Sequence, residues 1–167
     1  KSVPPVLFAL ALAVAALGAA AWWMRRTLLG VTPRIAAYVL GSLLIGPGLI
    51  VNVLLKDHWG RARPSQIVDF GGGARFSPAL WLSDQCTDNC SFASGHGALG
   101  FWVLCFALLA PPRWRGWAVA AALAFGTAMS VTRIAQGGHF LSDVAFSGAI
   151  TVAVIVVLHR WLVGKRL

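Results

Sequence analysis

The sequence contains no glutamate, and its acidic residues are five aspartates among 167 residues. Charged residues make up 11% of the chain, whereas a soluble domain carries roughly 25%. This scarcity excludes an ordinary soluble domain, because about half of the usual ionic surface is missing. Four of the aspartates are scattered through one polar stretch, and no His or Cys cluster has the spacing of metal ligands. No metal site is therefore predicted.

Hydrophobic residues make up 58% of the chain, and the mean hydropathy is +0.75. Apolar runs approaching the ~20 residues that cross a bilayer recur along the chain. We place them at 4–24, 35–55, 95–110, 115–132 and 141–162, the third being short for a span. The sequence thus predicts an all-α, polytopic transmembrane helix bundle. It forms a single membrane domain over 1–167, with a polar outer loop at 56–94.

The basic residues orient the predicted spans, because cytoplasmic loops retain Lys and Arg. One side of the membrane receives eight basic residues and no acidic residue: Arg25, Arg26, Arg34, Arg113, Arg115, Arg160, Lys165 and Arg166. The opposite side receives the other six basic residues and all five aspartates. The first side is therefore predicted to be cytoplasmic, and the outer loop faces the exterior.

This topology places Lys1 outside, so we expect either one more helix upstream or a cleaved signal sequence. The net charge of +9 is explained by the topology together with an anion site. No nucleic-acid partner is predicted, because the sequence has no basic stripe that could follow a phosphate backbone.

The three cysteines are of two kinds. Cys105 lies inside the third predicted span and is expected to be a small packing residue. Cys86 and Cys90 lie in the outer loop, on a side of the membrane where disulfides persist. Their spacing allows a bridge across a very small loop, and two free thiols are the alternative.

Arg133, His139 and Asp143 form the most specific polar group. His139 and Asp143 are four residues apart at the start of the fifth span, so on a helix they share a face. A carboxylate beside an imidazole fixes its tautomer and leaves the far ring nitrogen able to attack or to accept a proton. The alternative is structural, with Asp143 serving the helix start and His139 lying at headgroup level.

Ser94, Gly95 and His96 open the third span. A serine N-cap followed by glycine presents a hydroxyl and backbone amides, and the helix dipole adds partial positive charge. His96 could protonate a departing alkoxide, which requires a group with a pKa near neutrality. On its own this segment is weak evidence, because Ser-Gly is common at helix starts.

Lys56, Arg61 and Arg63 follow the second span, and Pro64 ends the segment. They could be interface charges whose long side chains reach the headgroups. Alternatively, Lys56 and Arg63 bring a point charge and a planar fork to one phosphate. What favours function is that all three segments fall on one side of the membrane. Together they could surround a tetrahedral dianion.

The spacing of these segments resembles the signature of the type 2 phosphatidic acid phosphatases. The shared pattern is Lys, six residues, Arg-Pro; Ser-Gly-His; and Arg, five residues, His, three residues, Asp. These enzymes are membrane lipid phosphatases, usually with six transmembrane helices, and their core is shared with acid phosphatases and vanadium haloperoxidases. Two positions depart from the family pattern: Ala93 replaces its usual Pro, and Thr132 replaces its usual Ser. Neither departure removes a catalytic group.

The resemblance implies a role for each matching residue. His139 would be the nucleophile that forms a phosphohistidine, Asp143 would orient it, and His96 would protonate the leaving alcohol. The phosphoryl oxygens would be held by Lys56, Arg63, Ser94, Gly95 and Arg133. No metal or cofactor is implied, because the cations belong to the protein itself.

The resemblance also implies a lipid substrate, whose headgroup phosphate lies at the depth of the site. Family members act on lipid A, phosphatidylglycerol phosphate, undecaprenyl diphosphate or phosphatidic acid. The motif-flanking residues look most similar to the bacterial lipid A phosphatase branch. This implies the bacterial inner membrane, with the site facing the periplasm or exterior. A membrane transporter and a vanadate-dependent oxidase are the alternatives from other classes, and the oligomeric state stays open.

Overall fold

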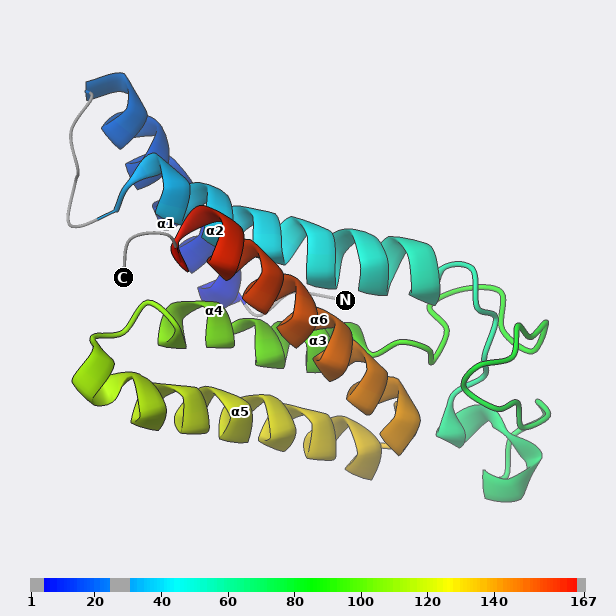
Figure 1. Cartoon of the computed structure of the whole chain (residues 1–167). Coiled ribbons are helices and arrows are strands. Elements are labelled where there is room, and N and C mark those ends of the chain that lie inside the picture. The colour runs from blue at the N-terminus through cyan, green and yellow to red at the C-terminus, as the bar shows by residue number, and fades with distance from the viewer. Residues whose placement is uncertain (1–4, 25–30, 165–167) are drawn as a thin grey trace.

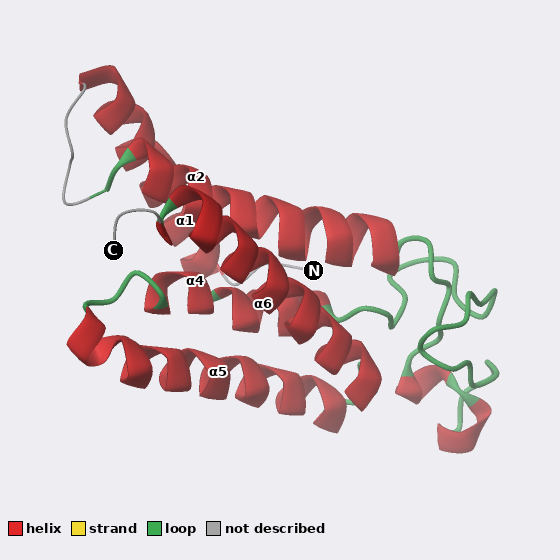
Figure 2. Cartoon of the chain, viewed as in Figure 1, coloured by secondary structure: helices red, strands yellow, loops and turns green. Residues whose placement is uncertain are grey.

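The computed structural model describes residues 5–24 and 31–164, and this part of the chain is helical without a β-strand (Figures 1 and 2). The longer helices are α1 (Pro5–Met24), α2 (Pro33–Leu43), η1 (Leu44–Lys56), α3 (Gly95–Trp102), α4 (Leu104–Ala107), α5 (Pro112–Ala135) and α6 (Leu141–Leu162). The predicted all-α membrane bundle is confirmed. Within the described residues, three helical stretches are long and apolar enough to cross a membrane: Pro33–Lys56, Pro112–Ala135 and Leu141–Leu162.

The predicted span at 35–55 is one continuous helix, but its second half is not an α-helix. Thr32 caps α2 by accepting a hydrogen bond from the Ile35 amide at 3.2 Å. From Leu44 to Lys56 the chain continues as a π-helix, η1, with Pro47 inside it. Proline has no amide hydrogen and interrupts the α-helical ladder. The Asn52 carboxamide donates to the Pro47 carbonyl at 2.6 Å.

The predicted span at 95–110 is shorter than expected. α3 and α4 are separated at Val103, and α4 ends at Ala107. Pro111 and Pro112 follow. A proline disfavours helical backbone at the residue before it, so the helix ends ahead of this pair. This stretch is an apolar helix shorter than a full span, whereas α1 covers the predicted span at 4–24 with 20 residues. One of the five predicted spans therefore falls short of the length that crosses a bilayer.

The core lies between α2, α3, α4 and α6. Tyr38, Trp102 and Ile155 are fully buried there. The Trp102 indole donates to the Ser42 hydroxyl at 3.1 Å, and the Tyr38 hydroxyl donates to the Cys105 carbonyl at 3.2 Å. The polar atoms of both aromatic side chains are thus satisfied, as burial requires. Cys105 is buried and free, as predicted.

The ends of four helices meet at one end of the bundle. η1 and α5 end there, and α3 and α6 begin there, beside the loop that runs from Asp57 to Ser94 (Figure 1). That loop contains two short 3-10 helices, η2 (Pro64–Gln66) and η3 (Val68–Phe70), and a disulfide between Cys86 and Cys90. The three polar segments of the sequence therefore meet at this end.

The charges expected on the cytoplasmic side lie at the opposite end where the structure describes them. Arg34 is at the start of α2, Arg113 and Arg115 are at the start of α5, and Arg160 is near the end of α6. Lys1, Arg25, Arg26, Lys165 and Arg166 lie outside the described residues.

Candidate active site

A cavity of about 500 Å³ opens where the four helix ends meet. Six of the eight residues predicted for the site line it: Lys56, Arg63, Gly95, His96, Arg133 and His139. Ser94 and Asp143 do not line the cavity and are fully buried beside it. Further lining comes from residues that the sequence did not single out: Asn52, Val53, Asp57, Asp88, Asn89 and Leu99.

His139 presents one ring nitrogen toward a main-chain carbonyl and leaves the other without a partner. Nδ1 lies 2.7 Å from the Ser91 carbonyl oxygen. Because a carbonyl only accepts, Nδ1 carries the hydrogen and Nε2 keeps its lone pair. Nε2 is buried and has no hydrogen-bond partner among the described residues. Burial lowers the pKa of His139 below its ordinary value, which favours this neutral form.

Asp143 lies behind His139, and its position corrects the geometry expected from the sequence. His139 precedes α6, which begins at Leu141, so the two residues do not share a helical face. Asp143 Oδ2 is 3.8 Å from His139 Nδ1, too far for a hydrogen bond. It accepts instead from the Phe140 amide at 2.8 Å and from the Ser91 hydroxyl at 2.5 Å. The direct partner of the imidazole is therefore the Ser91 carbonyl, and Asp143 also serves the helix start.

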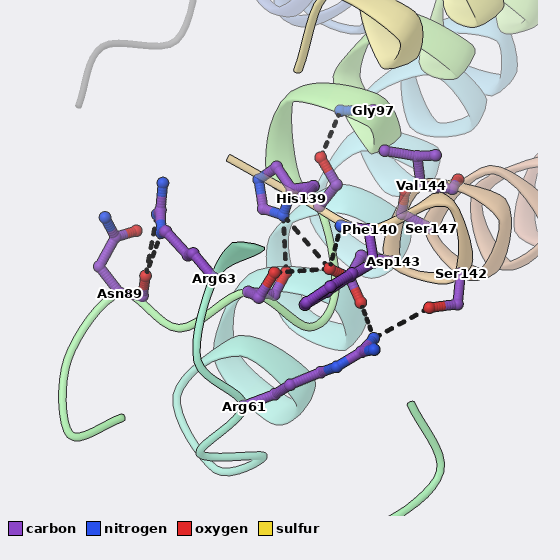
Figure 3. A network of polar contacts seen from close by, with 12 residues as sticks. Arg61, Arg63, Asn89, Gly97, His139, Phe140, Ser142, Asp143, Val144 and Ser147 are labelled. Atoms are coloured by element: carbon purple, nitrogen blue, oxygen red, sulfur yellow. Dashed lines mark hydrogen bonds and ion pairs between the residues drawn. The ribbon is translucent and has the colours of Figure 1, made fainter. Parts of the chain in front are cut away.

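Arg61 completes this buried network, although nothing in the sequence distinguishes it from the neighbouring basic residues. Its guanidinium is bonded to Asp143, and also donates to the Ser142 hydroxyl at 2.9 Å (Figure 3). Its Nε donates to the Ser77 carbonyl at 2.8 Å. The guanidinium carbon lies 4.2 Å from the centre of the Phe140 ring, within the range of a cation–π contact. Arg61 thus connects the loop from Asp57 to Ser94 to the buried Asp143 carboxylate.

Arg63, two residues further on, takes the opposite orientation and lines the cavity. Its Nε and Nη2 donate to the Asn89 carbonyl at 3.1 and 2.8 Å. Burial, and then the positive charge of Arg133, lowers the pKa of Arg63. Arg133 Nη1 donates to Gln136 at 2.5 Å, and its Nε is buried without a partner among the described residues. Concentrated positive charge of this kind favours an anionic ligand.

The Ser94-Gly95-His96 segment forms the helix start that the sequence predicts. Ser94 is the N-cap of α3 and accepts from the Gly97 amide at 3.2 Å. Its side chain faces this turn, while Gly95 and His96 line the cavity. A Cβ on Gly95 would lie 2.6 Å from the Asn52 carboxamide oxygen, so no larger residue fits this wall of the cavity without a shift.

A main-chain hydrogen bond joins two of the three motifs. The Ser65 amide donates to the Gly137 carbonyl at 3.1 Å, which joins the first motif to the third. Gly137 has a φ of 63°, a conformation that favours glycine. A Cβ on Gly138 would lie 2.9 Å from Arg133 Nη2. The two glycines therefore permit the turn that brings Arg133 and His139 to one cavity.

The cavity thus brings cationic side chains, helix N-terminal amides and two imidazoles to one place. This set can bind a tetrahedral anion, supply a nitrogen nucleophile and supply a proton donor. Within the described residues, no group of three or more His, Cys, Asp or Glu side chains could hold a metal ion.

Comparisons with known proteins agree with this chemistry. A family model described as "PAP2 superfamily" matches residues 34–167. A lipid A 4'-phosphatase of Francisella tularensis subsp. novicida is 42% identical over 127 residues, which are 75% of this chain and 55% of the relative. A lipid A 4'-phosphatase of Rhizobium leguminosarum is 45% identical over 120 residues, 71% of this chain and 51% of the relative. One of Rhizobium etli is 42% identical over 119 residues, 71% and 46% of the two chains.

The chain spans about half the length of the curated relatives it matches. No solved structure matches it significantly.

Proposed function

Because the chain belongs to the PAP2 superfamily, we propose that it is a membrane-embedded phosphatase that removes a phosphate monoester from a lipid headgroup. The observation that carries the proposal is the pose of His139. Its Nδ1 donates a hydrogen bond to the Ser91 carbonyl. Its Nε2 is buried at the wall of a cationic cavity and has no hydrogen-bond partner among the described residues. An imidazole held in this way is an activated nucleophile.

In the proposed reaction, His139 Nε2 attacks phosphorus while the bond to the lipid oxygen breaks. His96, on the same cavity, gives a proton to the departing alkoxide. Water then attacks the phosphohistidine, with His96 taking a proton from it, and the P–N bond breaks to release inorganic phosphate and neutral His139. Asp143 stabilises the imidazolium character that develops on the ring.

The phosphoryl oxygens are held by the side chains of Lys56, Arg63 and Arg133 and by the amides at the start of α3, with Ser94 setting that start. Preorganised donors of this kind stabilise charge in the transition state, and losing one typically costs about 3 to 4 kcal/mol of barrier. The protein's own cations supply this charge, so the step needs no cofactor.

For the substrate we propose the phosphate of a lipid A-type lipid. The support is the name shared by the three curated relatives. One end of the bundle carries Arg34, Arg113, Arg115 and Arg160. This basic charge supports a cytoplasmic position for that end. The cavity then faces the periplasm from a bacterial inner membrane.

The test is phosphate release by detergent-solubilised protein from lipid A, phosphatidylglycerol phosphate and undecaprenyl diphosphate. We expect lipid A to be hydrolysed with the highest kcat/KM, and hydrolysis to continue in EDTA. Similar rates on all three lipids would contradict the lipid A assignment but keep the phosphatase. No release from any of them would contradict the phosphatase itself.

A further inference from the structure

Residues 86–91, from Cys86 to Ser91, lie between the cavity and the buried carboxylate, and neither the motifs nor the family pattern assigns them a role. The disulfide between Cys86 and Cys90 closes a ring that contains Thr87, Asp88 and Asn89. Asp88 and Asn89 line the cavity. The segment is therefore part of the site's wall.

Two main-chain carbonyls of this segment, on either side of Cys90, hold the two groups that matter most in the proposed reaction. The Asn89 carbonyl accepts from Arg63 Nε and Nη2 at 3.1 and 2.8 Å (Figure 3). The Ser91 carbonyl accepts from His139 Nδ1 at 2.7 Å. A displacement of this backbone would therefore move both the Arg63 guanidinium, proposed to bind phosphate, and the His139 imidazole, the proposed nucleophile.

The segment is anchored at its C-terminal end, and the disulfide ties Cys86 to that end. On its C-terminal side, the Ser91 amide donates to the Arg61 carbonyl at 2.8 Å, and the Ser91 hydroxyl donates to Asp143. Cys90 is 2% exposed, so the ring is anchored in the core, while Cys86 is partly exposed. Asn89 has a φ of 51°, a left-handed conformation that asparagine adopts more readily than most residues.

We propose that residues 86–91 are a positioning segment, that the Cys86–Cys90 disulfide keeps it in place, and that the oxidised protein is the active form. The proposal rests on the proposed phosphatase function for its activity readout. Reduction by a dithiol would add two electrons and two protons, break the S–S bond and leave two thiols, while the dithiol becomes a disulfide. The Asn89 and Ser91 carbonyls would then lose one of their anchors.

The first test compares the double variant Cys86→Ser/Cys90→Ser with Cys105→Ala, which removes the buried free cysteine far from the cavity. We expect the double variant to lose about tenfold to a hundredfold in kcat/KM, the scale of a small misplacement of reacting groups. Cys105→Ala should retain its activity. A dithiol should lower wild-type activity similarly and leave the double variant unchanged.

The pH profile separates positioning from a general loss of fold. Burial lowers the pKa of His139 and its hydrogen bond to the Ser91 carbonyl raises it, so a ring that leaves this pose has a changed pKa. The acid limb of kcat/KM should therefore be displaced in the double variant. Unchanged kcat/KM and an unchanged acid limb would overturn the proposal.

Asn89 offers a test that leaves the cysteines in place. Glycine adopts the left-handed conformation without strain, whereas a β-branched side chain resists it. We expect Asn89→Gly to retain most activity and Asn89→Val to lose it, with a raised KM because the carbonyl that orients Arg63 is displaced. Equal activity of the two variants would count against a positioning role for residues 86–91.

Binding of inorganic phosphate, measured by calorimetry, separates this proposal from the function itself. If no lipid is hydrolysed, the phosphatase assignment fails. A weaker phosphate affinity of the reduced protein and of Asn89→Val would still support the positioning segment. Equal phosphate affinities of the oxidised and reduced proteins would overturn it.

Discussion

The two sides of His139 differ in how completely their polar groups are bonded. The cavity side comprises Lys56, Arg63, His96 and Arg133. The rear side comprises Arg61, Ser91 and Asp143, all buried. On the rear side Asp143 accepts from three donors. On the cavity side the Nε atom of Arg133 and Nε2 of His139 are buried without a partner among the described residues.

This difference indicates that the rear side positions His139, while the polar groups of the cavity side are able to bind a ligand. A buried ion pair adds little net stability, because desolvation offsets the Coulomb attraction, but removing one partner is strongly destabilising. Buried polar atoms without partners are costly, and in a native structure they require an explanation. A bound phosphate ester would accept a hydrogen bond from Arg133 Nε and bring an electrophilic phosphorus to the lone pair of His139 Nε2.

The largest expected effect is on the cavity side, at the nucleophile. We expect His139→Ala to lower kcat by about 10⁴-fold or more, the scale seen when an enzyme loses its nucleophile. Phosphate binding should survive, because the cations stay. His58→Ala is the matched control, since His58 is exposed and does not line the cavity. Substantial lipid hydrolysis by His139→Ala would break the proposed division of roles.

Arg61→Met tests the rear side and should have the next largest effect. It leaves the Asp143 carboxylate buried without its cation, which typically costs about 3 to 5 kcal/mol of stability. The Tm should fall, and kcat should fall more than KM rises, because no phosphate-binding group is lost. Arg63→Met should show the reverse pattern, with a raised KM and a nearly unchanged Tm. If both arginines behaved alike, the distinction between the two sides would fail.

Ser91→Ala removes the hydroxyl that bonds Asp143 but keeps the carbonyl that bonds His139. We expect a loss of roughly 1.5 to 3 kcal/mol in the free energy of unfolding, the range for a hydrogen bond to a charged group. The loss in kcat should be about tenfold, well below that of His139→Ala. Chemical denaturation and steady-state kinetics measure the two effects. A loss of kcat as large as that of His139→Ala would mean that the hydroxyl itself takes part in the reaction.

The smallest expected effect is on the pH dependence of kcat/KM, whose acid limb should be shifted to lower pH than an ordinary histidine would give. His139 attacks only when neutral, and burial lowers its pKa below the ordinary 6.5. As pH falls through that lowered pKa, Nε2 is protonated and activity is lost; above it, activity persists. The acid limb of kcat/KM should therefore lie below pH 6.5, after correction for the ionisation of the substrate phosphate by ³¹P NMR. A limb above that value would contradict the buried pose of His139.

Sequence reasoning succeeded where the signal was repeated or local. Apolar runs and the placement of basic residues predicted the bundle and the meeting of the three motifs at one end. The serine N-cap at Ser94 is likewise a local feature. The π-helical turns after Leu44 were missed, because hydropathy does not distinguish helix types, although Pro47 was the available clue.

Arg61 and Ser91 could not be found in this way. Arg61 and Arg63 lie in the same short segment with the same charge, and only folding turns one toward Asp143 and the other toward the cavity. The group that holds His139 is a main-chain carbonyl, which every residue carries, so the sequence contains no sign of it.

The chain's composition and motif spacing were sufficient to predict a membrane bundle with three polar segments at one end, because hydrophobicity, charge and residue type are properties of the residues themselves. The tertiary structure decided which atoms meet. It paired the imidazole with Ser91 rather than Asp143 and enclosed Asp143 with Arg61. The physical reason is that hydrogen bonds and ion pairs depend on distances between segments that are far apart along the chain.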